Sequence, residues 1–250
     1  MLRGQHLVGF GGKQPAAGGA APTPDILWWK FTDGSGTTVT ADVGPNGTIS
    51  GATWVTGKSG SGYALSFDGT NDTLLSASNV TYGTDVVTVT CWVKCPQTQM
   101  AASWINIVRS SEQIKSQDHP GWTMSAKGGY SYNLEGIIKS SSWGAGDPLR
   151  AEYDSSGLFP DDVWTHVAMV FDAPANSNAG EIKIYVDGSL VSTTIGRDAK
   201  TVSANYTADT IRVMFCPHLS YYTEGSIDDL RIYSGELDAT QIAAVYAEEY

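Results

Sequence analysis

The sequence predicts an all-β fold in which two antiparallel sheets pack face to face as a β-sandwich, followed by a short C-terminal helix. Short runs of alternating apolar and polar residues recur along the chain, and turn-forming clusters separate them. Glycine is abundant, with 28 residues among 250, as expected for many short strands joined by tight turns. No alternation of strands with long helical patterns and no repeat of fixed period is present. A single domain over residues 25–250 accommodates these features.

The first predicted strands carry turn signals at their ends. Residues 26–31 form a short apolar run that ends at the Asp-Gly-Ser-Gly cluster of residues 33–36. Residues 63–67 alternate and stop at an Asp-Gly pair. In residues 87–94 the odd positions are apolar, whereas the even positions hold threonines, Trp92 and Lys94. This alternation predicts a strand with one face on the core and the other half-exposed.

The later strands lead to one helix. Residues 164–171, 211–215 and 227–233 each read as a strand. Residues 181–191 read as a hairpin whose Asp187-Gly188 pair suits a tight type I′ turn, because both central residues need positive φ. The closing segment has a helical pattern with Asp238 as the expected N-cap.

The charge balance argues against one class of partner. The chain has 26 acidic and 15 basic residues, a net charge of −11. Nucleic acid is not an expected partner, because phosphate binding needs clustered Lys and Arg. The sequence has no apolar run of membrane-spanning length, and its start lacks the continuous apolar core of a signal peptide. We therefore expect synthesis in the cytoplasm and no membrane partner.

The three cysteines are expected to be reduced and mostly buried. Cys91 and Cys95 lie four residues apart in one predicted strand, and an extended separation of ~13 Å is too long for a disulfide. Adding Cys216 gives an odd number, and the spacings match no zinc-binding pattern.

Residues 1–24 differ from the rest of the chain. Gly, Ala and Pro dominate the stretch over residues 11–22, which can bury little apolar surface. Two interpretations stay open for this N-terminal arm. It is a flexible linker, or it anchors the domain in a larger assembly, where a protein partner or another copy of the chain orders it.

Five ordered segments carry a more specific signal. They are residues 31–39 with Asp42, residues 64–72, residues 87–94, residues 164–168 followed by 184–188, and residues 225–233 with Leu237 and the closing helix. Together they resemble the concanavalin A-like, laminin-G-like jelly-roll family. The resemblance covers residues 25–250 and implies two antiparallel sheets, one of them concave. Members include glycan lectins, adhesive modules, hydrolases and virion parts, so the resemblance alone does not fix an activity.

The residues favour a non-catalytic function. Relatives that hydrolyse β-glucans resemble one another in a strand of the pattern Glu-x-Asp-x-x-Glu or Glu-x-Asp-x-Glu, which places two carboxylates on one face. Here Glu152-Tyr153-Asp154 begins in this way, but Ser155, Ser156 and Gly157 follow. The Gly-x-Ser-x-Gly nucleophile pattern is also missing from the sequence. His166 lies within a predicted strand and is expected to be a structural, half-buried histidine.

Aromatic residues supply the candidate ligand-binding set, because the apolar side of a pyranose ring stacks on aromatic faces. Trp92 is expected on the polar-leaning face of its strand, where it would line the concave sheet. Residues 97–160 read as a connection longer than is usual in the family. The candidates are Trp92, Trp104, Trp122, Tyr130, Tyr132, Trp143, Tyr221 and Tyr222. These aromatics also suit a protein interface, and core packing is the alternative for each of them.

A structural calcium ion is a further expectation drawn from the resemblance. Asp228 matches a position in the last strand that supplies a ligand in many members, with Leu230 and Ile232 following on the same face. Backbone carbonyls near Asp33 and Gly34 would complete an oxygen shell of six to eight ligands. The alternative is that Asp228 only accepts backbone N–H bonds.

Three hypotheses of function follow. The first choice is a recognition module with lectin-like glycan-binding capacity, displayed on a virion as a decoration or fibre-type protein, for which the arm over residues 1–24 would be the anchor. A free-standing or appended lectin module that binds a glycan or cell-surface polymer is the alternative. The second alternative is a glycoside hydrolase with an unrecognised site.

Overall fold

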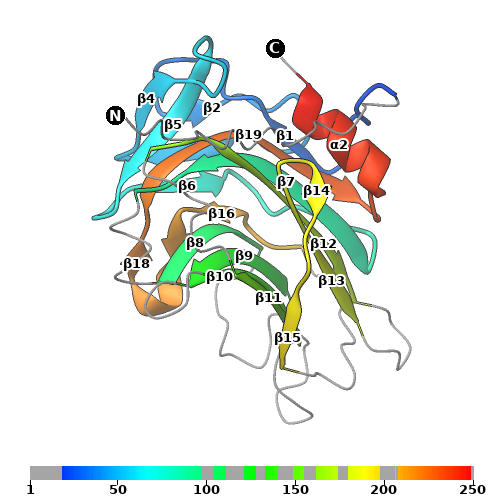
Figure 1. Ribbon diagram of the computed structural model, residues 1–250. Coiled ribbons are helices and arrows are strands. Elements are labelled where there is room, and N and C mark those ends of the chain that lie inside the picture. Colours follow the sequence, from blue (N-terminus) through cyan, green and yellow to red (C-terminus); the bar gives the residue numbers. More distant parts are fainter. Residues whose placement is uncertain are drawn as a thin grey trace, which may run out of the picture.

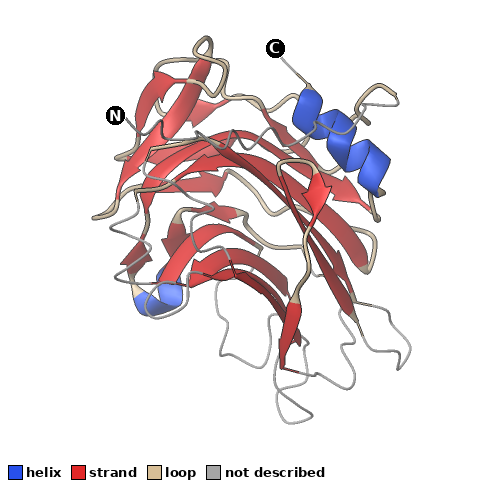
Figure 2. Cartoon of the chain, viewed as in Figure 1, coloured by secondary structure: helices blue, strands red, loops and turns tan. Residues whose placement is uncertain are grey.

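The computed structural model describes residues 19–96, 104–110, 121–127, 133–139, 149–154, 162–173, 180–197, 206 and 208–248. Within these residues the chain forms two large antiparallel sheets, a small hairpin, one turn of 3-10 helix and one α-helix (Figures 1 and 2). The predicted jelly-roll sandwich with a short closing helix is confirmed. None of the described helices is long and apolar enough to cross a membrane.

Sheet A contains eight of the described strands, in the order β14-β13-β12-β7-β19-β5-β4, with β1 paired to β19. Their bounds are β1 Leu27–Trp29, β4 Thr53–Thr56, β5 Tyr63–Asp68, β7 Val86–Lys94, β12 Thr165–Asp172, β13 Glu181–Val186, β14 Ser189–Leu190 and β19 Glu224–Ser234. Strand β19 lies inside the sheet, although it is the last strand of the chain.

Sheet B contains nine of the described strands, in the order β15-β11-β10-β9-β8-β16-β6-β3-β2. Their bounds are β2 Thr38–Val39, β3 Gly47–Ser50, β6 Thr73–Ser76, β8 Trp104–Arg109, β9 Gly121–Lys127, β10 Asn133–Lys139, β11 Leu149–Asp154, β15 Thr194–Arg197 and β16 Arg212–Val213. Strands β17 (Phe215–Cys216) and β18 (Tyr221–Tyr222) form a hairpin around the 3-10 turn η1 (Pro217–Leu219). Sheet B curves beneath sheet A, so its outer face is concave (Figure 1).

The main core lies between the two sheets. Alternate residues of each strand point inward, as the period of two requires, and they include the fully buried Trp29, Phe67 and Phe171. Trp122 of sheet B stacks on Phe171 of sheet A, with ring centroids 5.4 Å apart. Each such buried side chain contributes about 1.5–3 kcal/mol through removal of apolar surface from water.

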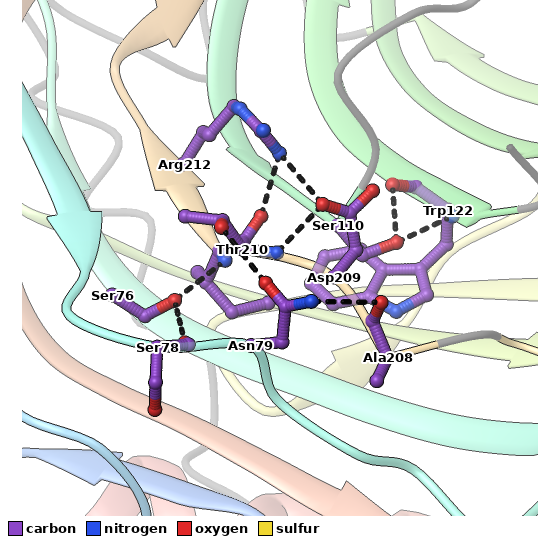
Figure 3. A network of polar contacts seen from close by, with 10 residues as sticks. Ser76, Ser78, Asn79, Ser110, Trp122, Ala208, Asp209, Thr210 and Arg212 are labelled. Atoms are coloured by element: carbon purple, nitrogen blue, oxygen red, sulfur yellow. Dashed lines mark hydrogen bonds and ion pairs between the residues drawn. The ribbon is translucent and has the colours of Figure 1, made fainter.

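A polar network fixes β16 against β6 at one end of sheet B (Figure 3). The hydroxyl of Ser76 accepts the backbone N–H of Ile211 at 2.9 Å. Arg212 donates to the carbonyl of Thr210 at 2.7 Å and forms an ion pair of 3.3 Å with Asp209. These bonds set the register in a place where each strand is too short to set it by its ladder alone.

Helix α2, Ala239–Ala247, packs on the face of sheet A that is turned away from sheet B (Figure 1). Asp238 caps its first turn in a capping box with Gln241, as the sequence predicts. A second, smaller cluster of apolar side chains forms beneath the helix, with Val170, Tyr185 and Val245 among its members.

This second cluster extends the folded region toward the N-terminus. The partly buried Ala21 packs against it, and Pro24 is buried. The folded part therefore includes residues before the predicted boundary at residue 25. Residues 1–18 of the predicted arm lie outside the described residues.

The predicted tight turn is confirmed, and so is the prediction that the cysteines are reduced and buried. Asp187 and Gly188 connect β13 to β14 with φ values of 45° and 75°, and Val186 pairs directly with Ser189. Cys91, Cys95 and Cys216 are all free and buried.

The interpretation of residues 97–160 as a long connection is wrong. This region contains β8, β9, β10 and β11, which form the middle of sheet B. Their inward positions hold small residues such as Ala126 and Gly136, while polar residues such as Thr123 and Ser125 occupy the outward ones. In β9 the apolar Trp122, Met124 and Ala126 alternate with Thr123 and Ser125, so the period of two is present in this strand but was missed.

Candidate functional site: a cleft at a strand junction

The edge of β19 changes its partner in the middle of sheet A. Strand β5 pairs with this edge as far as Ile227, and β1 pairs with it from Leu230 onward. Asp228 and Asp229 lie between the two partners, where β19 also carries a bulge opposite β7. A bulge reorients the neighbouring side chains, and bulges are common beside functional sites. The interruption leaves room for a site next to a well-ordered strand.

The loop over residues 57–62, with the sequence Gly-Lys-Ser-Gly-Ser-Gly, borders this interruption. A backbone hydrogen bond of 3.3 Å from Gly57 to Gly62 closes the loop. Gly57 must be glycine, because a Cβ there would lie 2.8 Å from the Ser61 carbonyl oxygen and 3.0 Å from a carboxylate oxygen of Asp228. The loop backbone is therefore held against the aspartate.

A cleft of about 340 Å³ opens between this loop, the end of β1 and the start of β5. We call it the junction cleft. It is lined by Lys30, Thr32, Lys58, Ser59, Ser61, Gly62, Tyr63 and Asp228. This volume lies at the lower end of the range for small-molecule sites.

Asp228 supplies the polar centre of the junction cleft. The residue is 4% exposed, and its Oδ2 accepts the backbone N–H of Lys58 at 2.9 Å. Its buried Oδ1 accepts no hydrogen bond from any of the described residues. Burial raises the pKa of Asp228 to about 6, although the Lys58 N–H opposes the rise. The cleft thus holds a costly acceptor that a bound hydroxyl or N–H group would satisfy.

Tyr63 forms an aromatic wall of the cleft. It packs edge-on against Trp54, with ring centroids 6.5 Å apart, yet the residue remains 46% exposed. Gly34 lies directly against its ring, since a Cβ at Gly34 would be 2.4 Å from two ring carbons. Support from both residues fixes the ring in place while leaving it accessible.

The two lysines of the cleft have partners elsewhere. Lys30 forms a 2.9 Å ion pair with Asp42 and lies over the Trp28 ring. The Lys58 ammonium donates to the Glu248 carbonyl at 3.1 Å and lies 4.7 Å from the centre of the Trp92 ring. Their ammonium groups are therefore held toward partners outside the lining of the cleft.

A buried ion pair between Asp229 and Arg231 stabilises the bulge in β19. Both oxygens of Asp229 accept hydrogen bonds of 2.8 Å from the Arg231 guanidinium, and both residues are 1% exposed. The Trp28 indole N–H donates to the same carboxylate at 3.0 Å. Arg231 also bonds Glu248 at the end of α2, at 2.6 Å. These bonds hold Asp229 at its positive φ of 49°, which Asp tolerates better than most residues.

The structure contradicts a binding role for Trp122. Its side chain is 1% exposed and lies in the main core between the sheets, against Phe171 and Tyr82. The indole is on the inward set of positions of β9, a strand that was not predicted from the sequence.

Trp92 lies on the outer face of sheet A, and this face is not the concave one. Tyr246 of helix α2 stacks on it with ring centroids 5.4 Å apart, and His166 contacts it from the neighbouring strand. His166 is structural, as predicted, but fully buried rather than half-buried, and burial lowers its pKa to about 3. The predicted place of Trp92 on an open concave sheet is therefore wrong.

Three of the predicted aromatics belong to β8 and to the β17–β18 hairpin. Strand β8 begins at Trp104, and the hairpin that carries Tyr221 and Tyr222 contacts this strand through Thr223, which bonds the Asn106 backbone at 3.1 Å. Tyr221 is exposed, and Tyr222 stacks on Phe215 with centroids 4.8 Å apart. Their binding role stays a prediction. The candidates Tyr130, Tyr132 and Trp143 lie outside the described residues.

The side chains at the predicted calcium site make other contacts. Both carboxylate oxygens of Asp33 accept hydrogen bonds from Thr40, at 2.6 and 2.9 Å. Both lysine side chains and the hydroxyl groups of Thr32, Ser59 and Ser61 share the cleft with Asp228. In the part of the chain that the structure describes, no three His, Cys, Asp or Glu side chains gather where they could share a metal ion. Calcium stays a prediction, and a melting temperature that rises with Ca²⁺ and falls with chelator would support it.

Sequence reasoning also missed a pair of carboxylates on the concave face of sheet B. Glu135 and Glu152 are direct cross-strand partners on β10 and β11. Arg150 forms an ion pair of 2.9 Å with Glu135, and Asn133 donates to Glu152 at 2.9 Å. A motif search along one strand does not detect a pair that two strands bring together.

A family model described as the concanavalin A-like lectin/glucanase superfamily, of the laminin-G type, matches residues 67–243, more than half of the chain. The chain belongs to this superfamily. The predicted family is therefore confirmed. No curated protein matches this sequence.

Solved structures share the fold of this superfamily member at low identity. The receptor-binding domain of the botulinum neurotoxin mosaic serotype C/D is 17% identical with a TM-score of 0.63, over 89% of this chain and 50% of that one. The serotype D ligand-binding domain in complex with N-acetylneuraminic acid is 17% identical with a TM-score of 0.62 and the same coverage. The type G receptor-binding domain is 15% identical with a TM-score of 0.57, over 90% and 51%. The chain thus spans about half the length of these domains, and the likeness establishes the fold.

Proposed function

We propose that this chain is a non-catalytic glycan-binding module and that its sugar ligand occupies the junction cleft. The observation that carries this proposal is the 4% exposed carboxylate of Asp228 in the lining of the cleft, whose buried Oδ1 accepts no hydrogen bond from the described residues. An unsatisfied buried acceptor costs about 1–3 kcal/mol, which a donating hydroxyl group would recover. Sugars present such hydroxyl groups around a ring with an apolar side.

The other walls of the junction cleft suit the same ligand. Tyr63 lines the same cleft as Asp228 and is 46% exposed, and Ser59 and Ser61 add hydroxyl groups that can both donate and accept. A few converging polar groups on an otherwise apolar wall are typical of small-molecule sites. A superfamily rich in lectins and a structural neighbour named for its complex with a sugar add support.

Tyr63→Ala is expected to weaken glycan binding at least tenfold, because it removes the aromatic wall while leaving the core intact. A glycan array identifies the ligand, and titration calorimetry then compares the dissociation constants of the variants. Tyr221→Ala is the matched control, since Tyr221 is a second exposed tyrosine outside the cleft. A loss in Tyr221→Ala with no change in Tyr63→Ala would move the site to the β17–β18 hairpin.

Display on a virion or another assembly is the narrower form of this proposal. It rests on the composition of residues 1–24, which suits an anchoring arm. Sizing the protein with and without these residues tests it. An oligomer or a particle attachment that disappears on deletion supports anchoring, and an unchanged assembly counts against it.

Glycoside hydrolysis is the second candidate, because Glu135 and Glu152 are direct neighbours on the concave face. Arg150 and Asn133 already engage this pair, an arrangement that suits a structural network better than a proton donor and a nucleophile. We expect no new reducing ends when the array-selected glycan is incubated with the protein. Their release by the wild type, and not by Glu152→Gln, would establish hydrolysis instead.

A further inference from the structure

A second cleft, of about 610 Å³, lies on the same face of sheet A and next to the junction cleft. We call it the edge cleft. Its floor is a row of side chains on four adjacent strands, in which Thr53 pairs with Ser66, Ser66 with Ser226, and Ser226 with Lys94. Three hydroxyl groups and one ammonium group therefore follow one another across the sheet.

The two clefts adjoin along two separate segments. Ser226 lines the edge cleft and Asp228 lines the junction cleft, on the same face of β19 and ~7 Å apart along the strand. Thr56, at the end of β4, lines the edge cleft, and Lys58, two residues on, lines the junction cleft. A ligand that extends beyond one cleft along the direction of the strands therefore reaches the other cleft.

The charge of the edge cleft selects against anionic ligands. Asp68, Asp72, Asp162 and Glu224 contribute carboxylates, whereas Lys94 is the cation in its lining. Lys94 is itself bonded to Asp162 at 2.9 Å. An acidic ligand would have to enter this excess of negative charge, while a neutral polyhydroxylated ligand would find acceptors for its hydroxyl groups.

The backbone keeps the edge cleft open at its outer end. Gly51, with φ of 84°, lies against Asp72, and a Cβ there would lie 1.9 Å from a carboxylate oxygen. Asp72 accepts the backbone N–H of Asp68 at 2.9 Å, which fixes the turn between β5 and β6. These two contacts fix the backbone and the Asp72 carboxylate at this end of the cleft.

We propose that the two clefts together bind a linear, uncharged oligosaccharide that runs across the outer face of sheet A. This inference rests on the proposed function, and it names the ligand class: an extended neutral chain and not a single terminal sugar. The junction cleft binds one end through Tyr63 and Asp228. The edge cleft binds the following units through the hydroxyl groups of Thr53, Ser66 and Ser226.

The test measures how affinity depends on ligand length. Titration calorimetry is carried out with glucose and galactose oligomers of one to six linear units, in the linkage that the glycan array selects. The wild type is expected to bind the hexasaccharide at least tenfold more tightly than the disaccharide. Equal affinity for both lengths would overturn the inference while leaving the junction cleft as a disaccharide site.

Thr53→Trp places an indole in the edge cleft from an exposed position on the edge strand β4, where aromatic residues are well tolerated. The gain in affinity from disaccharide to hexasaccharide is expected to disappear, so that this variant binds the two oligomers equally. Thr48→Trp, at an exposed strand position of sheet B outside both clefts, is the matched control. Thr53→Tyr repeats the test with a smaller ring, and circular dichroism confirms folding of each variant. A retained gain in both Thr53 variants would overturn the inference.

A hexasaccharide capped with N-acetylneuraminic acid tests the charge. It is expected to bind less tightly than its neutral counterpart, and tighter binding would overturn the uncharged ligand class. Tyr63→Ala distinguishes a failure of the proposed function from a failure of the further inference. If this variant binds every oligomer as the wild type does, the junction cleft is not the site and the proposed function fails with the inference.

Discussion

Arg231→Met is expected to lower the free energy of unfolding by about 3–5 kcal/mol, the usual loss when one partner of a buried ion pair is removed. The guanidinium donates to both oxygens of Asp229, and both residues are 1% exposed. Methionine retains much of the volume but leaves the carboxylate buried without its cation. Urea unfolding followed by tryptophan fluorescence measures the change as a shift of the midpoint.

Lys183→Met is the matched control for Arg231→Met. Lys183 forms ion pairs with Glu236 at 2.7 Å and Glu181 at 3.3 Å, but on the exposed surface. Such pairs contribute about 0–1 kcal/mol. The double variant Asp229→Asn with Arg231→Met should lose less than Arg231→Met alone, because no buried charge remains. Equal losses in the Arg231 and Lys183 variants would show that burial adds nothing to the Asp229–Arg231 pair.

Asp228→Asn is expected to stabilise the protein at neutral pH while weakening ligand binding. Burial raises the pKa of Asp228 from 3.8 to about 6, so the folded state binds more protons than the unfolded state between these values. The stability of the wild type therefore falls as the pH rises from about 4 to about 6 and stays lower above that. A rise of about two pKa units corresponds to about 3 kcal/mol. Asparagine keeps an acceptor for the Lys58 N–H without the charge.

The gain in Asp228→Asn should reach about 3 kcal/mol at pH 7.5 and disappear near pH 4, which urea unfolding at both pH values measures. Asp33→Asn is the control, because Asp33 is an exposed carboxylate that bonds Thr40. A gain of the same size at both pH values would contradict the raised pKa. If Asp228→Asn stabilises the protein but retains full glycan affinity, the negative charge is not part of the binding site.

The sequence predicts the strands of sheet A well, whereas those of sheet B were predicted poorly. In β7 the inward valines and Cys91 alternate with Trp92 and polar residues, so the period of two is visible. In β10 the inward set includes Gly136, which packs closely against the opposite sheet and contributes little to an apolar pattern. In β9 the inward Trp122 and Met124 alternate with polar residues, a signal that was present in the sequence and was missed.

Asp228 was identified from the sequence as a candidate, but the face of β19 on which its side chain lies was predicted wrongly. Alternation places it on the same face as Leu230 and Ile232, which lie in the core. The bulge after Asp228 adds one residue, so Asp228 pairs with Trp92 on the outer face instead. A positive φ at Asp229 leaves no signature in an isolated sequence. Nor does alternation reveal that Tyr246 of α2 covers Trp92.

Tyr63 and the loop over residues 57–62 were missed because their surroundings come from distant segments. The glycine-rich loop reads as an ordinary turn, and Tyr63 reads as the first residue of a strand. Only the change of partner on β19 places Asp228 beside them. Lys58 and Asp228 are separated by 170 positions in the chain.

The interior place of β19 has a consequence for biosynthesis. This strand contacts β7 on one edge and both β5 and β1 on the other, so sheet A cannot close before residues 224–234 have been made. Until then β7 and β5 each present an unsatisfied edge, and such edges pair readily with other chains. Folding of sheet A should therefore wait for these residues and be slow, as for other topologies dominated by distant contacts. Nascent chains that stall before residue 224 should depend on chaperones to remain soluble.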